Sequence, residues 1–271
     1  MIINRHGRTD LALGLTCLLL ALGPLSCSPE RADTADTVER DGALYVRGSM
    51  EPFSGVQVAY HEDSTTLRAE IRYRSGVRHG RAVGYYPNGE KSVEEGYQEG
   101  VRSGKRREWY ENGQLKNRQT YVEGESEGVL EEWSEEGQLV LQRPMKDGKA
   151  HGLTQSWYPG GAKKAELSYE SGNLQGAAVE WYENGQKKFE FSYQRGRRDG
   201  PATEWHENGQ LRSEGAYKAG KPDGPYSEWH EDGQKKVEAL YEDGELVEIQ
   251  MWDENGETVP VSLEPESVDA G

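Results

Sequence analysis

Tryptophan recurs along this chain at a fixed interval of 24 residues. The positions in register are Trp109, Trp133, Trp157, Trp181, Trp205 and Trp229, and Tyr85 takes the same place one interval upstream. Three columns of glycine and one of tyrosine keep the same interval, and one glycine column includes Gly113, Gly185, Gly209 and Gly233. Self-similarity at a fixed period indicates a repeat architecture, in which each unit buries its apolar surface against its neighbours. We therefore expect a row of about eight or nine copies of one small unit.

Each unit has the pattern of two strands joined by a tight turn. In the unit around Trp181, residues 177–182 are expected to form one strand and residues 186–193 the returning strand. The pair Asn184-Gly185 lies between them. This pair is typical of hairpin turns, because both residues accept a positive φ at low cost.

The second turn of the unit, expected over residues 194–200, carries Gly196 and Gly200. Both glycines are expected to adopt backbone conformations that a Cβ disfavours. Trp181 and Tyr193 belong to adjacent strands of one hairpin, and their repetition is expected to stack aromatic rings along one face of the sheet. The fold class predicted is all-β, an elongated single-layer antiparallel sheet of tandem 24-residue hairpins.

The segment Glu-Trp-Tyr-Glu-Asn-Gly-Gln, residues 180–186, and the spacing Tyr-x-x-Gly-x-x-x-Gly resemble MORN-variant repeats. Such repeats occur in bacterial proteins of the YwqK-like antitoxin group. The resemblance extends over about residues 45–256. It implies a repeat scaffold that binds other proteins, with neutralisation of a toxin as the activity of some members. For eukaryotic MORN proteins it also implies lipid binding and dimerisation.

The composition limits what such a chain can be. Only 34% of the residues are hydrophobic and 30% are charged, which argues against a thick globular core. Seven Trp and 15 Tyr residues argue against a chain that buries nothing. The net charge of −16 repels nucleic acid and anionic lipid headgroups and favours a basic partner. Glutamates beside the tryptophans, such as Glu204 and Glu228, are expected to face water because side chains alternate along a strand.

Residues 1–26 have the pattern of a lipoprotein signal peptide. Their apolar run, residues 11–22, is shorter than the roughly twenty residues that a transmembrane helix needs. Ser26 before Cys27 resembles a bacterial lipobox, which implies that Cys27 is acylated and becomes the mature N-terminus. The alternative is ordinary cleavage nearby, which leaves Cys27 as a free thiol or removes it. Ser28 favours the outer membrane for a chain that is exported and lipid-anchored in the cell envelope.

The chain divides into four predicted regions. The signal peptide is followed by residues 27–41, a disordered tether rich in charge, Thr and Ala. The MORN-variant array follows over residues 42–257, and residues 258–271 form an acidic disordered tail. The membrane is contacted only through the N-terminal lipid.

No residue has the surroundings that a catalytic or metal-binding group needs. His206 and His230 occupy a column that holds Tyr110 and Tyr182 in other units, so this position tolerates exchange. No cysteine follows Cys27, and no calcium-loop or histidine-pair pattern is present in the sequence. We expect a protein without enzymatic activity, metal or cofactor.

Two basic clusters stand out against the acidic balance as possible partner contacts, namely Arg106 with Arg107 and Arg197 with Arg198. Two functions remain open from the sequence. The first is a non-catalytic, membrane-tethered repeat scaffold that binds a protein or an envelope polymer. The second is an antitoxin or immunity-like protein that binds and neutralises a toxin, possibly a basic one. Neither the partner nor the oligomeric state follows from the residues.

Overall fold

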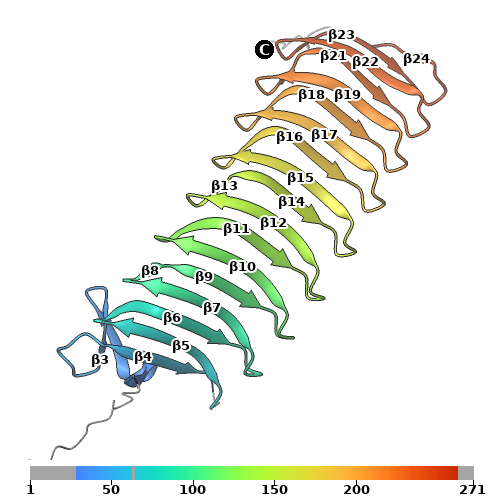
Figure 1. The fold of residues 1–271 in the computed structure, drawn as a ribbon. Helices are drawn as coiled ribbons and strands as arrows, with labels where there is room; N and C mark the ends of the chain where they lie inside the picture. The colour runs from blue at the N-terminus through green and yellow to red at the C-terminus, as the bar shows by residue number, and fades with distance from the viewer. Residues whose placement is uncertain (1–28, 63–64, 262–271) are drawn as a thin grey trace, which may run out of the picture.

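The computed structural model describes residues 29–62 and 65–261 and shows one long, open sheet of consecutive hairpins (Figure 1). Each hairpin lies beside the one that precedes it in the chain, so the ribbon grows steadily from the N-terminal to the C-terminal end (Figure 1). The predicted fold class is confirmed. The signal peptide, Cys27 and residues 262–271 lie outside the described residues.

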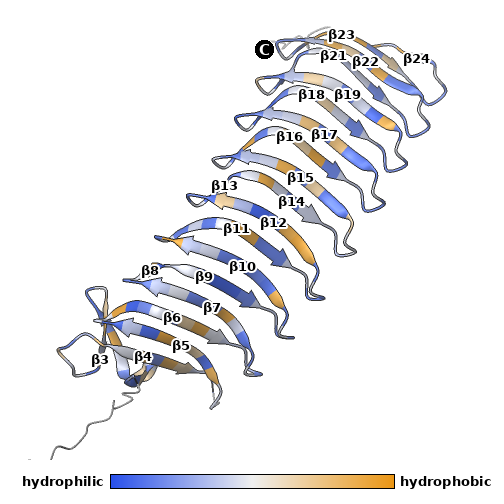
Figure 2. Ribbon diagram, viewed as in Figure 1, coloured by the Kyte–Doolittle hydropathy of each residue, from blue (hydrophilic) through white to orange (hydrophobic). Residues whose placement is uncertain are grey.

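The described residues form nine successive hairpins, in agreement with the predicted number. Their strands are β4 (Gly55–Tyr60) and β5 (Leu67–Arg74); β6 (Val77–Tyr85) and β7 (Lys91–Gln98); β8 (Val101–Arg102), β9 (Gly104–Trp109) and β10 (Leu115–Val122); β11 (Glu125–Trp133) and β12 (Leu139–Lys146); β13 (Lys149–Ala150), β14 (Gly152–Trp157) and β15 (Lys163–Glu170); β16 (Asn173–Trp181) and β17 (Lys187–Gln194); β18 (Arg197–Trp205) and β19 (Leu211–Lys218); β20 (Lys221–Pro222), β21 (Gly224–Trp229) and β22 (Lys235–Glu242); β23 (Glu245–Trp252) and β24 (Thr258–Val259). In Figure 2 hydrophobic and hydrophilic segments alternate along the strands over the whole ribbon.

The turn between β16 and β17 differs from the predicted one. Gly185 has a φ of 86°, but Asn184 is not among the residues with positive φ, so only one residue of the pair adopts it. The Gly185 N–H donates to the Tyr182 carbonyl at 2.9 Å, which closes a turn over residues 182–185. Asn184 contributes through its side chain instead, since its Oδ1 accepts a hydrogen bond from the Gln186 N–H at 3.0 Å.

The second turn is shorter than predicted. Arg195 and Gly196, with φ values of 51° and 79°, form a two-residue turn between β17 and β18. Both residues have positive φ, as a type I′ turn requires. Gly200 has a φ of 105° and lies inside β18, where the pairing with β17 slips between Phe191 and Tyr193. The second glycine of each unit therefore belongs to a β-bulge within a strand and not to the turn.

Aromatic side chains lie on both faces of the sheet, which corrects the prediction of a single aromatic face. Trp181 pairs with Lys187, but Glu180 pairs with Phe189, so Lys188 is an extra residue in β17. This extra residue reverses the alternation of side chains, and Tyr193 comes to lie opposite Gly176. Tyr193 therefore shares a face with Glu180 and Phe189, and Trp181 lies on the other face.

Neighbouring hairpins are joined by hydrogen bonds that recur along both margins of the sheet. At one margin the Tyr182 hydroxyl donates to the Trp205 carbonyl at 2.9 Å, and Asn184 Nδ2 donates to the Glu207 carbonyl at 2.8 Å. At the other margin the Gly196 N–H donates to the Leu174 carbonyl at 2.8 Å. The tyrosine bond recurs from Tyr86, Tyr110 and Tyr158 to Trp109, Trp133 and Trp181.

The N-terminal end of the sheet is covered by a segment that was predicted to be disordered. Residues 31–40 of the expected tether form β1 (Arg31–Asp33), the short 3-10 helix η1 (Thr34–Asp36) and β2 (Thr37–Arg40). β1 pairs in parallel with β4, and β2 pairs with β3 (Ala43–Val46) in a separate hairpin. Phe53, which is 3% exposed, packs with Ala32 and Leu44 beneath them. This order has a physical reason, because an uncovered first strand would leave unpaired backbone groups and apolar surface.

At the opposite end, β24 pairs with the end of β23 through Thr258 and Val259, so the first residues of the predicted tail belong to the sheet. Residues 260–261 complete the described part of the chain. Within residues 29–62 and 65–261 we find no helix with the length and apolar character to cross a membrane.

The tyrosine bond between hairpins is missing where Ser134 takes the tyrosine position, and this leads to a stability prediction. Replacing Ser134→Tyr should supply a hydroxyl for the Trp157 carbonyl and raise the free energy of unfolding by about 1 kcal/mol. Tyr182→Phe should lower it by a similar amount, because its hydroxyl donates to Trp205. Urea unfolding measures both changes, and amide hydrogen exchange locates them. Faster exchange in β12 and β14 of the Ser134→Tyr variant would contradict the prediction.

Candidate functional site

The two faces of the sheet differ in burial. We call the face that carries Tyr193, Tyr217 and Tyr241 the tyrosine face, and the opposite face, which carries Trp181 and Trp205, the tryptophan face. Beyond Gly84, all ten described residues that are buried lie on the tyrosine face: Tyr97, Gln119, Thr154, Ala165, Ala178, Phe191, Ala202, Ser213, Val237 and Ala239. The tyrosine face therefore holds the small core of this thin sheet.

A single row of side chains runs along the middle of the tyrosine face, with one residue from each main strand at the same level. We call it the central row, and its members are Ala82, Glu95, Arg106, Gln119, Leu130, Arg143, Thr154, Leu167, Ala178, Phe191, Ala202, Gly215, Tyr226 and Ala239. The row is mostly polar from Glu95 to Thr154 and apolar or aromatic from Leu167 onward.

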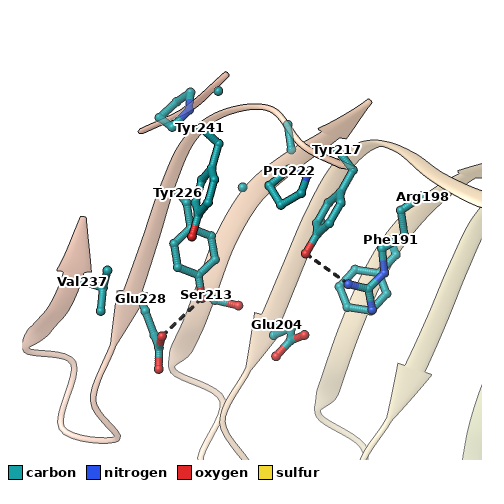
Figure 3. A pocket seen from close by; sticks show the side chains of 15 residues that line it. Phe191, Arg198, Glu204, Ser213, Tyr217, Pro222, Tyr226, Glu228, Val237 and Tyr241 are labelled. Carbon is teal, nitrogen blue, oxygen red and sulfur yellow. Dashed lines mark hydrogen bonds between the residues drawn. The ribbon is translucent and has the colours of Figure 1, made fainter. Parts of the chain in front are cut away.

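The apolar part of the row contains a pocket of about 390 Å³ (Figure 3). Its floor is formed by the row from Phe191 to Tyr226, and Tyr217 and Tyr241 stand at its margin. Figure 3 shows these rings projecting from neighbouring strands toward the same space.

Two departures from the repeat accompany this pocket. Gly215 brings no side chain to the central row, where the preceding hairpin has Phe191. Pro222 stands seven residues before its tryptophan, the position held by Arg78, Arg102 and Arg198 in three other hairpins. Pro222 is smaller than an arginine, and the Tyr226 ring packs over Gly215, 3.1 Å from the position that a Cβ would take. The pocket is lined by all three residues.

Aromatic rings form the walls of the pocket. The rings of Tyr226 and Tyr241 meet edge to face, with centroids 6.3 Å apart and planes at 83°. The guanidinium of Arg198 lies 4.0 Å from the Phe191 ring centroid and 5.1 Å from that of Tyr217. Arg198 Nη1 also donates to the Tyr217 hydroxyl at 3.3 Å. Arg198 is held by rings and phenol oxygens, and it is in none of the ion pairs found among the described residues.

Two carboxylates, Glu204 and Glu228, also line the pocket. The Tyr226 hydroxyl donates to Glu228 Oε2 at 3.3 Å, and Lys236 Nζ lies 2.7 Å from Glu228 Oε1. Glu204 Oε2 lies 3.6 Å from Arg212 Nη1. Burial raises the pKa of Tyr226 to about 12, and the charge of Glu228 acts in the same direction. At neutral pH this phenol is a hydrogen-bond donor.

The polar part of the tyrosine face has a different character. Gln119 and Thr154 are each only 3% exposed, yet Gln119 Oε1 and Thr154 Oγ1 have no hydrogen-bond partner among the described residues. The same holds for Asn117 Oδ1 and Arg143 Nε on this face, whereas Arg106 Nε has only the ion pair with Glu95 Oε2 at 3.5 Å. A buried polar atom without a partner costs about 1–3 kcal/mol. The four atoms of Gln119, Thr154, Asn117 and Arg143 therefore leave hydrogen-bonding capacity unused on this face.

The structure separates the basic residues that the sequence placed together. Arg106 lies in the central row and contacts Glu95 and Glu108, whereas its neighbour Arg107 lies on the tryptophan face. Arg198 lines the pocket on the tyrosine face, and Arg197 is an exposed residue beside the two-residue turn. The two clusters are almost four hairpins apart, about 36 Å at 4.8 Å per strand. They do not form one basic surface.

The repeat-defining residues have structural positions. Tyr85 and the tryptophans of the array lie on the tryptophan face, and the glycines Gly113, Gly185, Gly209 and Gly233 have positive φ in the turns. Cations from the preceding hairpin cover several indole rings, as Lys163 does for Trp181 at 5.4 Å. His206 Nε2 lies 2.9 Å from the Trp229 carbonyl, in the place of the tyrosine bond. Within the described residues no group of three His, Cys, Asp or Glu side chains could hold a metal ion.

Sequence reasoning missed Tyr226, Gly215, Pro222 and Ser213, and it assigned Glu204 and Glu228 only to a solvent-facing role. Both glutamates are half-buried on the tyrosine face. One signal was available in the sequence for Tyr226, Gly215 and Pro222, since these residues differ from those at the equivalent positions of the other hairpins. Tyr226 stands where other hairpins have Ala82, Arg106, Leu130, Thr154, Ala178 and Ala202.

Comparison with known families supports the repeat assignment. Four segments, residues 102–123, 174–195, 198–219 and 222–243, match the family model described as the MORN repeat variant. Each match begins seven residues before a tryptophan, so all four share one register with the hairpins. No curated protein matches the sequence. MORN repeats are generally protein-binding or membrane-binding modules and typically serve as non-catalytic scaffolds.

The raised pKa of Tyr226 predicts how stability depends on pH. Its folded-state pKa of about 12 lies above the ordinary tyrosine value of 10.0, so its contribution is fully present below pH 10 and is lost as the pH rises through about 12. The Tyr226→Phe variant should lose less unfolding free energy over this interval than the unaltered chain. Urea unfolding at several pH values measures this, and tyrosinate absorbance should lose one late-titrating group. An unchanged absorbance titration would contradict the assignment.

Proposed function

We propose that this protein is a non-catalytic repeat scaffold of the bacterial cell envelope that binds an extended segment of a protein partner along its tyrosine face. The observation that carries the proposal is the contrast between a constant framework and a variable central row. The tryptophan-bearing strands, the turns and the bonds between hairpins repeat, while the row changes from hairpin to hairpin. The residues that repeat in every hairpin are explained by the needs of the fold. The residues of the central row vary on this constant framework, as expected if they recognise one particular partner.

The burial pattern supports the same face. Its buried polar atoms without partners lie in the polar part of the row, and the pocket lies in the apolar part. A bound segment would supply hydrogen bonds to the first and apolar contact to the second, as the core of a protein interface does. Because one row extends along the ribbon, an extended chain matches it better than a compact ligand.

The charge favours a protein over a membrane or nucleic acid as the partner. At a net charge of −16 the surface repels phosphate groups and attracts basic segments. A basic toxin is one such partner, and its neutralisation would be a special case of the same binding. The protein is then anchored to the membrane through the lipid on Cys27, and Ser28 favours the outer membrane.

A pair of variants in two neighbouring strands tests the binding face. Leu167 belongs to the central row, and Val179 lies on the tryptophan face of the adjacent strand. Leu167→Glu should weaken partner binding about tenfold or more, because it places a charge in the contact, and Val179→Glu should leave it unchanged. The partner is first captured with the unaltered chain from envelope extract and identified, and its affinity for each folded variant is then measured.

Equal losses in both variants, or a loss only in Val179→Glu, would contradict binding through the tyrosine face. Capture of glycan in place of protein, with the same dependence on Leu167, would replace the protein partner with an envelope polymer.

The lipid anchor has its own test in the two cysteines of the sequence. Cys27→Ala should abolish incorporation of a labelled fatty acid and move the protein from the membrane to the soluble fraction. Cys17→Ala, within the apolar run of the signal peptide, is the matched control and should change neither result. Persistent labelling of the Cys27→Ala variant would rule out this anchor.

A further inference from the structure

The repeat has a position at which its own arginines are held by tyrosines. Arg198 lies between Tyr193, its cross-strand partner in β17, and Tyr217, and its guanidinium contacts the Tyr217 ring and hydroxyl. Arg78, near the N-terminal end of the sheet, repeats this arrangement. Its Cζ lies 5.4 Å from the Tyr97 ring centroid, and its Nη1 lies 3.3 Å from the Tyr97 hydroxyl. The fold thus has a defined place for a guanidinium between two successive tyrosines.

The hairpin of β20, β21 and β22 has the two tyrosines of this arrangement without the arginine. Pro222 takes the arginine position between Tyr217 and Tyr241, and Pro222 pairs across the strands with Tyr217. Beneath the place of the missing side chain, Gly215 stands where Phe191 lies beneath Arg198, and the Tyr226 ring packs over Gly215, with its Cδ2 3.1 Å from the position that a Cβ would take. The 390 Å³ pocket lies beside this ring, with Pro222 and Gly215 in its lining.

Another hairpin without the arginine has larger side chains at both positions. Leu174 occupies the arginine position between Tyr169 and Tyr193, and Leu167 lies at the level of Gly215. Two leucine side chains replace the missing arginine there. The hollow at Pro222 is therefore not a general result of losing the arginine from this position.

The lining of the pocket contains two carboxylates, Glu204 and Glu228, and one cation, Arg198. Each carboxylate also pairs with a cation outside the lining, Glu204 with Arg212 and Glu228 with Lys236, so the attraction for a further cation comes from the negative faces of the tyrosine rings. Arg198 is a like charge, but the fold tolerates this spacing elsewhere. Arg78 and Arg102 occupy the same position in two consecutive hairpins, on either side of Tyr97.

We propose that the pocket over Gly215 binds the guanidinium of an arginine side chain presented by the protein partner, in the place that Arg198 and its equivalents occupy in other hairpins. The proposal rests on the proposed function, because it identifies one contact that the partner makes with the tyrosine face. The arginine stacks on the rings of Tyr217 and Tyr241, its N–H groups donate to their hydroxyls, and Glu204 and Glu228 line the same space.

A guanidinium fits this place better than an ammonium group. All three of the chain's own cations at this position are arginines, and a planar group with five donors can stack on a ring and donate to two phenol oxygens together. The lysines of the array are found over rings at other positions, such as Lys187 over Trp205.

The test uses the full chain with a small probe of defined chemistry. Nα-acetyl-arginine methylamide is titrated into the nitrogen-labelled protein, and amide chemical shifts are followed by NMR. We expect saturable shifts at Gly215, Tyr217, Tyr226 and Tyr241. The citrulline analogue has nearly the same shape without the charge and should bind at least about tenfold more weakly.

Two variants distinguish the pocket from a general attraction of cations to an acidic protein. Pro222→Arg should fill the place with the chain's own guanidinium and abolish binding of the probe. Leu174→Arg adds the same charge at the same position two hairpins away, and it should leave probe binding intact. Circular dichroism and the unperturbed amide spectrum of the other hairpins establish that each variant is folded.

Three results would overturn the proposal: no localised shifts, equal binding of arginine and citrulline analogues, or undiminished binding in folded Pro222→Arg. None of these results would contradict the scaffold function, because the Leu167 and Val179 variants test that function independently of the pocket. Conversely, failure of partner capture would leave the probe titration informative, because it needs no partner.

Discussion

The hydrogen bond from each turn tyrosine to the tryptophan carbonyl of the next hairpin recurs through most of this structure. A single-layer sheet has no second layer against which to bury its side chains, so the hairpins are held through one another's backbones. The Tyr182 hydroxyl bond to Trp205 and the Gly196 amide bond to Leu174 fix the two margins of each hairpin relative to the next one. With both margins fixed, the strands are held at a constant level. The central row follows from that alignment.

The sequence predicted the number of hairpins and the place of their turns, because the columns of tryptophan and glycine are visible without any structure. It could not predict the faces. Trp181 pairs with Lys187 and Glu180 pairs with Phe189, so Lys188 is one extra residue in its strand. This residue places Tyr193 on the face of the sheet opposite to Trp181. A bulge of one residue leaves no mark in a 24-residue period, yet it exchanges the two faces for every residue that follows. The prediction of one aromatic face was wrong for this reason.

The same limit explains which parts of the candidate site were out of reach. Arg106 and Arg107 form a cluster in the sequence, but consecutive strand residues face opposite ways, so only Arg106 belongs to the central row. Pro222, Gly215 and Tyr226 are irregular in their columns, and the alignment of hairpins alone could have marked them. Only the structure shows that these three residues line one pocket. Their proximity depends on the pairing of β19 with β21 and on the face of the sheet at which each residue lies.

A site of this kind is made by exchange of side chains in the central row, and the fold tolerates such exchange. Bonds between hairpins persist beside the pocket: His206 Nε2 lies 2.9 Å from the Trp229 carbonyl, Asn208 donates to the Glu231 carbonyl, and the Gly220 N–H donates to the Arg198 carbonyl. None of these bonds involves the central row. The loss of an arginine between Tyr217 and Tyr241 therefore removes local ring contacts, part of which the edge-to-face pair of Tyr226 and Tyr241 replaces. Stability resides at the margins and recognition in the middle of the face, so each hairpin can change what it binds without opening the sheet.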